Sequence, residues 1–558
     1  MSRKMGKDRP ILPQVLCGLA LCFTALIFAP VEMVTLNNIN FWFGVGDFLP
    51  LFIALFLAAF AVVELVYLGL RRLPYALWLL SLALLFGVTL GVYVQGTYLC
   101  MGSEALVSGE PVWREMRREM LVNTAIWAAI LLGSVALSLT KPKLFLKAVP
   151  AVSALILVME GAALVSLMTG SRYNSDINHI YCSDEEQFTF SDNGDVIMIM
   201  LDTFDTRYLD RALAEDPDYA DVFEDFTYYR NTSSSTMLTD SSFASFMTGQ
   251  TPDNSEPFFL YCRRAFKESR FFPIMKDAGM TVQVYGAPDG VFSVDQMEQV
   301  DNLCVRAAHV GDMRAFVTEM LCMLGYRYLP TLAQPFMLQD YTRNFARLQE
   351  MDDGPAESTS NNPAFIRKLN ADGVTVDQSR RFYKFFLLHG AHAPTQMNRD
   401  MEETEGTDRY EQLMGCFAML DALFGQLREK GVYDKATILV FGDHGINDDW
   451  RKGVCNPVML VKYPGERGPM RTSMAPATLL DLRATALCGA GLDYAQVGTP
   501  AHEWEGAGHR DRTLLTYVYD VPSSYAFYLN DMTEYAVPDD ATDLEGYVPS
   551  GRVLRRPE

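Results

Sequence analysis

The chain has 558 residues and a formal net charge of −21, and this charge is unevenly distributed. Residues 1–170 carry 12 basic and 9 acidic residues, whereas the remaining 388 residues carry 35 and 59, a net charge of −24. An acidic second part argues against nucleic acid as a partner, because phosphate backbones are bound by basic surfaces. The ten cysteines form no Cys-x-x-Cys motif, which argues against a zinc ribbon and a disulfide scaffold. Cys262 and Cys304 could pair if the second part lies outside the cytoplasm.

The first part contains five apolar stretches, each long enough to cross a bilayer, which takes about 20 residues. The first stretch is not a cleaved signal peptide, since it lacks a small-residue cleavage site and further apolar segments follow. The five predicted spans are Ile11–Pro30, Phe48–Leu70, Leu73–Val94, Leu121–Leu139 and Ala148–Met168.

Basic residues predict the orientation of these spans, because cytoplasmic loops carry an excess of Lys and Arg. Three basic groups fall on one side if the N-terminus is cytoplasmic, and an odd number of spans then places the chain after residue 170 outside the cell membrane. The loop 95–120 is an exception with its three arginines. The aromatic loop 37–47 is interpreted as an interfacial belt, or alternatively as a loop that guides a lipid headgroup. The three groups are Arg3, Lys4, Lys7 and Arg9; Arg71 and Arg72; and Lys141, Lys143 and Lys147.

The second part alternates strand and helix patterns, which predicts an α/β domain with a doubly wound, mostly parallel sheet. We expect a transmembrane domain over 1–170, a linker over 171–192, a catalytic domain over 193–530 and a C-terminal extension over 531–558. Within the catalytic domain, the middle of 339–376 is polar and predicts a loop or insertion. Predicted strands are Asp195–Asp202, Thr281–Tyr285, Tyr383–Leu388, Thr437–Phe441 and Pro457–Lys462, and predicted helices are Ser241–Met247, Tyr410–Lys430 and Ala477–Leu487.

Two of these strands end in metal-ligating side chains. The apolar run from Thr437 ends in Asp443 and His444, and the run from Asp195 ends in Asp202. Strand ends in open α/β sheets are where ligand sites form. Carboxylate and imidazole together suit zinc or manganese. An Asp-His pair alone is more often part of a turn, and Asp205 is more simply the start of a helix than a ligand.

Hydroxyl residues crowd the segment before the helix at Ser241. Most of them fit a serine-rich loop or a helix N-cap. A hydroxyl at a helix N-terminus beside a metal can also be a nucleophile. Composition leaves Thr232, Ser235, Thr236 and Thr239 as rivals for this role.

In this order, the motifs resemble those of the alkaline phosphatase and sulfatase superfamily. With five spans ahead, the chain is also similar to lipoteichoic acid synthases and phosphoethanolamine transferases. The sulfatase signature places the nucleophile ten residues before the glycine of a closing Thr-Gly, which selects Thr239 by its distance from Gly249. Threonine cannot form the aldehyde that sulfatases use, which favours phosphoryl transfer over sulfate ester hydrolysis. The transferases usually carry Glu where this chain has Asp202.

The resemblance implies one divalent metal, manganese or zinc with magnesium as a further candidate, because no Asp-x-x-x-His pair precedes the strand that begins at Thr437. Its ligands would be Asp202, Thr239, Asp443 and His444. Gly390-Ala-His392-Ala-Pro394 is similar to a Gly-Ser-His-x-Pro segment whose histidine faces substrate phosphate. His389 would contact substrate or only pack at the strand end. His509 and Arg510 would add phosphate contacts or belong to a surface loop.

The function that this resemblance implies is phosphoryl-group transfer at the membrane. A phospholipid would donate a phosphoglycerol or phosphoethanolamine headgroup through a phosphothreonine intermediate, and an envelope glycan or lipid would accept it. A phosphodiesterase or other hydrolase of the same fold is one alternative. A non-catalytic lipid-binding regulator is the other.

Overall fold

The protein forms two compact units in the computed structural model. The first contains residues up to His179 together with Ala307–Asp352, and the second contains Ile180–Arg306 and Asp353–Glu558. The structure describes residues 9–37, 41–99, 117–169, 179–288, 290–337, 341–404, 406–445, 456–517 and 529–556.

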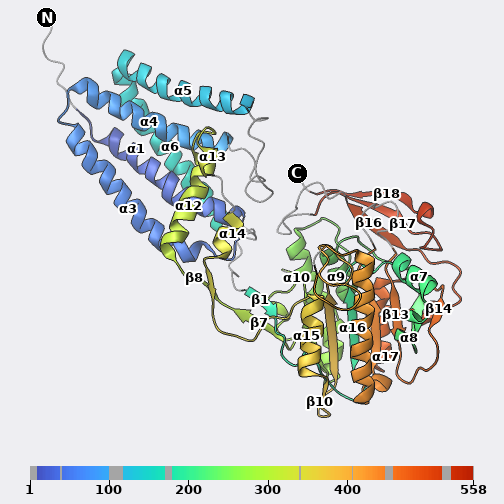
Figure 1. Cartoon of the computed structure of the whole chain (residues 1–558). Coiled ribbons are helices and arrows are strands. Elements are labelled where there is room, and N and C mark those ends of the chain that lie inside the picture. Colours follow the sequence, from blue (N-terminus) through green and yellow to red (C-terminus); the bar gives the residue numbers. More distant parts are fainter. Residues whose placement is uncertain are drawn as a thin grey trace, which may run out of the picture. The chain divides into compact units, whose positions relative to one another are not determined.

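The first unit contains, within the described residues, five helices long and apolar enough to cross a membrane (Figure 1). This confirms the predicted number of apolar helices. The first of them runs over Leu12–Leu36 and contains a π-helical turn at Thr24–Phe28, between α1 (Leu12–Phe23) and α2 (Ala29–Leu36). The other four are α3 (Val45–Leu70), α4 (Tyr75–Tyr98), α5 (Arg117–Thr140) and α6 (Pro142–Thr169).

A later segment of the chain returns to these helices. Residues 307–352 contain α12 (Met313–Tyr328), α13 (Gln334–Met337), α14 (Tyr341–Ala346) and the antiparallel pair β8 (Ala308–Val310) and β9 (Gln349–Met351). The Tyr328 hydroxyl donates to the Glu32 carboxylate over 2.7 Å, and Arg327 lies 3.0 Å from the same group. The predicted catalytic domain, 193–530, included this segment, whereas in the structure its apolar side chains pack with those of α2, α3 and α5.

The second unit is built on a seven-stranded sheet in its described part, with the order β14-β4-β13-β12-β3-β11-β6. The predicted fold class is confirmed in that β12, β3, β11 and β6 run parallel. The strand expected at Pro457–Lys462 is β13, and it runs antiparallel to both neighbours. The strands are β3 (Val196–Leu201), β4 (Thr227–Tyr229), β6 (Thr281–Tyr285), β11 (Phe382–Leu388), β12 (Thr437–Phe441), β13 (Met459–Lys462) and β14 (Arg471–Ser473).

Helices cover both faces of this sheet (Figure 1). The β3 side chains alternate between two apolar clusters, which is why the strand is apolar at every position. One cluster includes α7 (Thr206–Glu215), α15 (Asn362–Asp372) and α16 (Arg409–Glu429), and the other includes α9 (Thr239–Thr248), α10 (Phe258–Glu268), α11 (Phe271–Asp277) and α17 (Leu482–Gly489). Helix α16 confirms the helix predicted from apolar spacing. Helix α17 begins later than predicted, because Thr478 caps a separate 3-10 turn at Leu479–Asp481.

Shorter elements complete the second unit. The predicted C-terminal extension is partly a sheet, since β17 (Met532–Ala536) and β18 (Val548–Leu554) pair antiparallel with β16 (Thr513–Tyr517). The buried Arg512 guanidinium donates to backbone oxygens of Asn231, Pro538 and Asp539, which fastens this part to the core. Cys262 and Cys304 are both free. The remaining strand pairs are β1 (His179–Cys182) with β7 (Leu303–Arg306), β2 (Thr189–Phe190) with β10 (Thr375–Val376), and β5 (Thr232–Ser233) with β15 (Ala477–Thr478).

The register of the central strands brings three strand ends together. Leu201 of β3 is paired with Leu388 of β11, and Met200 is paired with Phe441 of β12. The pairing continues beyond β3, because the Asp202 amide donates to the Leu388 oxygen and the Ala391 amide donates to the Asp202 oxygen. The residues that follow β3, β11 and β12 therefore lie at one edge of the sheet.

Gly390 makes this close approach possible. Its φ is +56°, and a Cβ atom there would lie 2.4 Å from the Asp202 oxygen and 2.5 Å from its nitrogen. We expect Gly390→Ala to destabilise the protein through both backbone strain and this clash with main-chain atoms. Gly279→Ala is the matched control, because Gly279 has a φ of +76° but open space around the missing Cβ.

Thermal unfolding of the full chain in detergent measures the difference. Strain alone costs about 1–2 kcal/mol, and the clash adds about 1–3 kcal/mol for Gly390→Ala. Each kcal/mol lowers the melting temperature by about 2–4 °C in a domain of this size. Equal melting temperatures for the two variants would contradict the close approach.

Candidate metal centre

Asp202, Asp443 and His444 form a buried cluster at the edge where β3 and β12 end. One ligand atom from each residue lies within 4.8 Å of the others. The His444 Nε2 atom is 3.3 Å from Asp443 Oδ2 and 4.0 Å from Asp202 Oδ1. The other ring nitrogen, Nδ1, lies 2.7 Å from the Gly445 oxygen, which fixes the orientation of the imidazole. The strand pairing thus brings two carboxylates and one imidazole nitrogen close to one another.

Thr239 joins this cluster from another direction. It is the first residue of α9, and its hydroxyl donates to Asp202 Oδ2 over 3.2 Å. The rival hydroxyls of Thr232 and Thr236 have other partners, the Tyr229 oxygen and the Ser241 hydroxyl. The structure therefore brings the four predicted ligands together.

Two residues that the sequence did not single out, Thr203 and Ser242, hold Asp202 and Asp443 in place. The Thr203 amide donates to Asp443 Oδ1 over 3.0 Å, and the Thr203 hydroxyl donates to Asp202 Oδ1 over 2.8 Å. Thr203 does this with a φ of +61°, a conformation that costs a β-branched residue energy and is often found at functional sites. The Ser242 hydroxyl donates to the Asp443 backbone oxygen over 2.6 Å. Only the position of Thr203 directly after Asp202 could have marked it in the sequence.

The cluster has the chemistry of a cation site. Asp443 Oδ2 is buried without a hydrogen-bond partner, although Asp443 is fully buried. Burial, followed by the neighbouring Asp443, raises the pKa of Asp202 to about 7. Burial opposes charge on His444, but the two carboxylates outweigh it and raise its pKa. A divalent cation would take up the orphaned oxygen and offset the repulsion between the carboxylates, so these residues fit such an ion.

The predicted substrate histidines lie at the neighbouring strand end, after β11. His392 is exposed, and its pKa is lowered first by partial burial of the ring and then by His389, with opposing effects of Asp443 and His444. The His392 ring lies against the His389 ring, with 5.3 Å between the ring centroids. His389 Nε2 lies 2.9 Å from the Pro394 oxygen, so this side chain serves the turn. Gln412 stabilises this turn, because its side-chain amide donates to the backbone oxygens of Gly390 and His392.

The remaining candidates have partners of their own. His509 lies 2.6 Å from Asp539, and Arg510 pairs with Asp481 over 2.6 Å. The structure thus gives neither side chain a contact with the cluster. Asp205 is the N-cap of α7 and accepts from the Arg207 amide, which agrees with the interpretation as a helix start.

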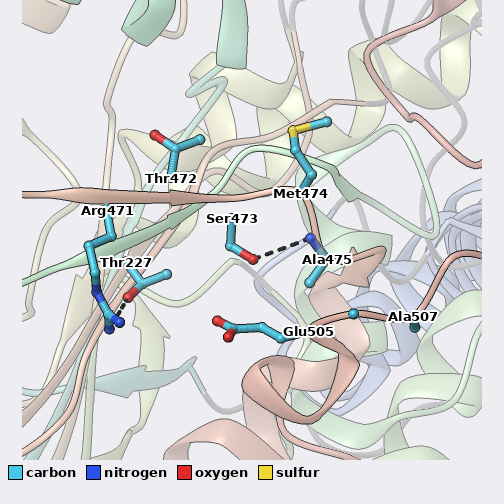
Figure 2. Close-up of a pocket in the computed structure, with 9 residues that line it drawn as sticks. Thr227, Arg471, Thr472, Ser473, Met474, Ala475, Glu505 and Ala507 are labelled. Carbon is cyan, nitrogen blue, oxygen red and sulfur yellow. Dashed lines mark hydrogen bonds between the residues drawn. The ribbon is translucent and has the colours of Figure 1, made fainter.

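A cavity of about 460 Å³ lies elsewhere in the second unit, along the edge strand β14. Its walls include Arg471, Ser473 and Glu505, and Figure 2 shows the Glu505 carboxylate directed into the space between them. None of the four cluster residues lines this cavity. The orphaned oxygen and the converging ligand atoms, rather than cavity size, therefore identify the candidate site.

No protein-family model and no curated protein matches the sequence. Solved structures similar to the chain include the lipoteichoic acid synthase LtaP from Listeria monocytogenes, with 10% identity over 64% of this chain and 85% of that one and a TM-score of 0.33. A phosphonate monoester hydrolase from Silicibacter pomeroyi shares 15% identity over 64% and 88%, with a TM-score of 0.34. An alkaline phosphatase superfamily protein from Vibrio parahaemolyticus shares 10% identity over 67% and 80%, with a TM-score of 0.37.

The cluster predicts that Asp443→Asn abolishes binding of a divalent metal. The substitution replaces an ionised ligand with a neutral amide at the most buried position. Purified full chain, loaded with manganese or zinc and dialysed, should contain one equivalent of metal by elemental analysis, and the variant well under a tenth of that. Asp205→Asn is the matched control, because asparagine also caps a helix and Asp205 lies outside the cluster. Equal metal contents in the two variants would contradict the ligand assignment.

The raised pKa of Asp202 predicts a pH dependence of metal binding. Its value of about 7 lies above the ordinary 3.8, so the metal-free folded protein keeps this proton between about pH 4 and 7, where the unfolded chain has lost it. A proton then competes with the metal, and affinity should fall about tenfold per pH unit below pH 7 for each proton displaced. Competition with a chelating dye at pH 8, 7 and 6 measures this. Affinity that is constant from pH 8 to 6 would contradict the prediction.

Proposed function

We propose that the protein is a membrane-anchored, metal-dependent phosphoryl-group transferase. It would move a phospholipid-derived headgroup, of phosphoglycerol or phosphoethanolamine type, to an envelope glycan or lipid. The observation that carries the proposal is the contact between the Thr239 hydroxyl and Asp202 within a buried cluster of metal-ligating side chains. A hydroxyl that lies at the start of a helix beside metal ligands is in a suitable position to act as a nucleophile.

The four ligands would hold the cation, with Asp202, Asp443 and His444 supplying carboxylate and imidazole atoms and Thr239 its oxygen. When bound, a manganese or zinc ion favours the Thr239 alkoxide and offsets the negative charge of a phosphate. The contact with Asp202 orients the hydroxyl before any substrate arrives. The amides at the start of α9 add partial positive charge where the phosphate would lie.

The reaction that these residues support is a displacement at phosphorus. Thr239 Oγ1 forms a bond to the phosphorus of the phospholipid, and the bond from phosphorus to the diacylglycerol oxygen breaks. Diacylglycerol leaves with the proton that the threonine hydroxyl has lost. An acceptor hydroxyl then attacks the phosphothreonine and restores Thr239. Atoms and charge balance without an oxidant or reductant.

His392 suits contact with the phosphate. Because its pKa is lowered, the ring is neutral at pH 7 and can donate one hydrogen bond from a ring N–H to a phosphate oxygen. Its exposure leaves it accessible to a substrate that approaches from solvent or membrane. We assign it to substrate binding rather than to the metal.

The five apolar helices support a location in the cell membrane. We propose that the catalytic unit lies on the extracytoplasmic side, on the grounds of the three groups of basic residues that would face the cytoplasm. A lipid donor and an envelope acceptor both suit this location. No nucleic acid is expected as a partner, given the acidic second part.

A hydrolase of the same fold would use the same residues and would differ only in passing the phosphoryl group to water. A regulator without catalysis would have no need of a hydroxyl directed at a buried carboxylate. The site thus favours an enzyme over a regulator. The acceptor distinguishes transfer from hydrolysis, so the test must follow the product as well as the covalent intermediate.

We expect Thr239→Ala to abolish a covalent adduct and the release of diacylglycerol, because the substitution removes the hydroxyl that contacts Asp202 from the start of α9. Full chain with manganese is incubated with phospholipid labelled in its headgroup phosphate, quenched in acid and examined by peptide mass spectrometry. The wild type should carry the label on the peptide that contains Thr239.

Ser245→Ala is the matched control, since Ser245 lies on the same helix and its hydroxyl donates to the Ser241 oxygen. It should form the adduct at wild-type level. Thr239→Ser should keep a measurable part of the activity. An adduct that persists in Thr239→Ala would overturn the assignment of the nucleophile, and free phosphorylated headgroup as the sole product would favour the hydrolase.

A further inference from the structure

A small cavity of about 250 Å³ opens within the first unit, where α4 ends and α5 begins. It is smaller than a pocket for a drug-sized ligand, which is about 300–1,000 Å³. Its lining is mostly apolar but includes charged side chains at the start of α5. A cavity of this size at the end of a membrane-crossing helix would accommodate a headgroup and its glycerol rather than a whole lipid.

One wall of the cavity is a single face of α5. Arg118, Val122 and Ile126 follow one another at intervals of four residues, so they lie above each other on the helix. The charged residue lies in the first turn and the apolar residues lie one and two turns further along. In a bilayer-spanning helix this order runs from the interface toward the hydrocarbon, which matches the polarity of a phospholipid from phosphate to acyl chain.

The opposite wall comes from the returning segment. Thr331 is fully buried, and its hydroxyl has no hydrogen-bond partner although it lines the cavity. Its backbone amide donates to Asn123 Oδ1 over 3.0 Å, and the Asn123 amide donates to Gln95 over 2.7 Å. These bonds hold the segment against α4 and α5. An orphaned hydroxyl in a cavity wall is available to an ester or phosphate oxygen of a ligand.

The charges at the mouth of the cavity are complementary to a zwitterionic headgroup. Arg118 and Glu119 both line it, both are exposed, and neither has a hydrogen bond or ion pair among the described residues. A guanidinium suits a phosphate, and a carboxylate suits an ammonium group. A headgroup that carries a phosphate and an ammonium would satisfy both.

The cavity lies on the side of the membrane where the chain leaves for the second unit. If all five helices cross, the end of α4 at Tyr98, the start of α5 at Arg117 and the end of α6 at Thr169 share one side. After α6, the chain continues into the second unit. A lipid in the cavity would therefore lie in the leaflet at which α6 ends, whichever way the protein is oriented.

We propose that this cavity binds the headgroup and glycerol of a zwitterionic glycerophospholipid of phosphoethanolamine type. The identity of this lipid as the donor rests on the proposed function, whereas its binding rests on the cavity alone. Arg118 pairs with the phosphate, Glu119 with the ammonium, Thr331 donates to a phosphate or ester oxygen, and Val122 and Ile126 contact the start of the acyl chain.

Native mass spectrometry of the delipidated full chain in detergent tests the proposal, with phosphatidylethanolamine, phosphatidylglycerol and diacylglycerol added separately. The wild type should retain phosphatidylethanolamine best and diacylglycerol least. Arg118→Gln should lower retention of both phospholipids about tenfold, the effect of losing about 1.4 kcal/mol of binding free energy. Glu119→Gln should lower retention of phosphatidylethanolamine only. Val122→Trp should fill the cavity and lower retention of both.

Arg117→Gln is the matched control, because Arg117 precedes Arg118 on the helix but does not line the cavity. Equal retention in Arg118→Gln and Arg117→Gln, or unchanged retention in Val122→Trp, would overturn the site. Equal loss of both phospholipids in Glu119→Gln would overturn the headgroup assignment. The measurement is repeated in Thr239→Ala, which keeps lipid binding separate from catalysis. Selective retention by a wild-type chain that forms no adduct at Thr239 would leave the cavity assigned and overturn the transferase.

Discussion

The in-register pairing of β3 with β11 on one side and β12 on the other is the constraint on which the candidate site depends. It places Asp202 between the turn that carries His392 and the turn that carries Asp443 and His444. Each of these strands is buried on both faces, so a slip by one residue would move every side chain into the closely packed cluster on the other face of the sheet. The geometry of the cluster is therefore fixed by the core of the sheet rather than by the loops that carry the ligands.

The same pairing concentrates charge where it is costly. Two carboxylates and an imidazole are buried together, and the carboxylates raise each other's energy. Thr203 adopts a positive φ to supply two hydrogen bonds to them, and one carboxylate oxygen is left without any. A fold selected for stability alone would replace such a cluster with apolar residues. A bound cation would explain why backbone strain, buried charge and an orphaned oxygen occur at one place. The Thr239 hydroxyl beside them is the group that such a cation would activate.

The elements that could be predicted from the sequence are those whose pattern depends on their own residues. Strands β3 and β12 are almost entirely apolar runs, β11 is apolar apart from Lys384, and α16 has helical spacing. Thr239 follows from a fixed distance to Gly249. The antiparallel direction of β13 could not be predicted, because a doubly buried strand has the same pattern in either direction. The pairing of Arg510 with Asp481 could not be predicted either, because only the tertiary structure brings these two residues together. The return of residues 307–352 was missed because the partners of α12, such as Glu32, lie about 300 residues earlier in the chain.

The returning segment and the arginines at the start of α5 are connected through one cavity. If the other three basic groups face the cytoplasm, Arg117 and Arg118 lie on the opposite side of the membrane, against the usual distribution of basic residues. A phosphate bound at Arg118 would account for this arginine, because its charge would then bind a ligand and would not determine the orientation of the helix. Thr331 lines the cavity from the returning segment 307–352, whose two ends continue into the second unit, so a bound lipid would contact both the helices and this segment.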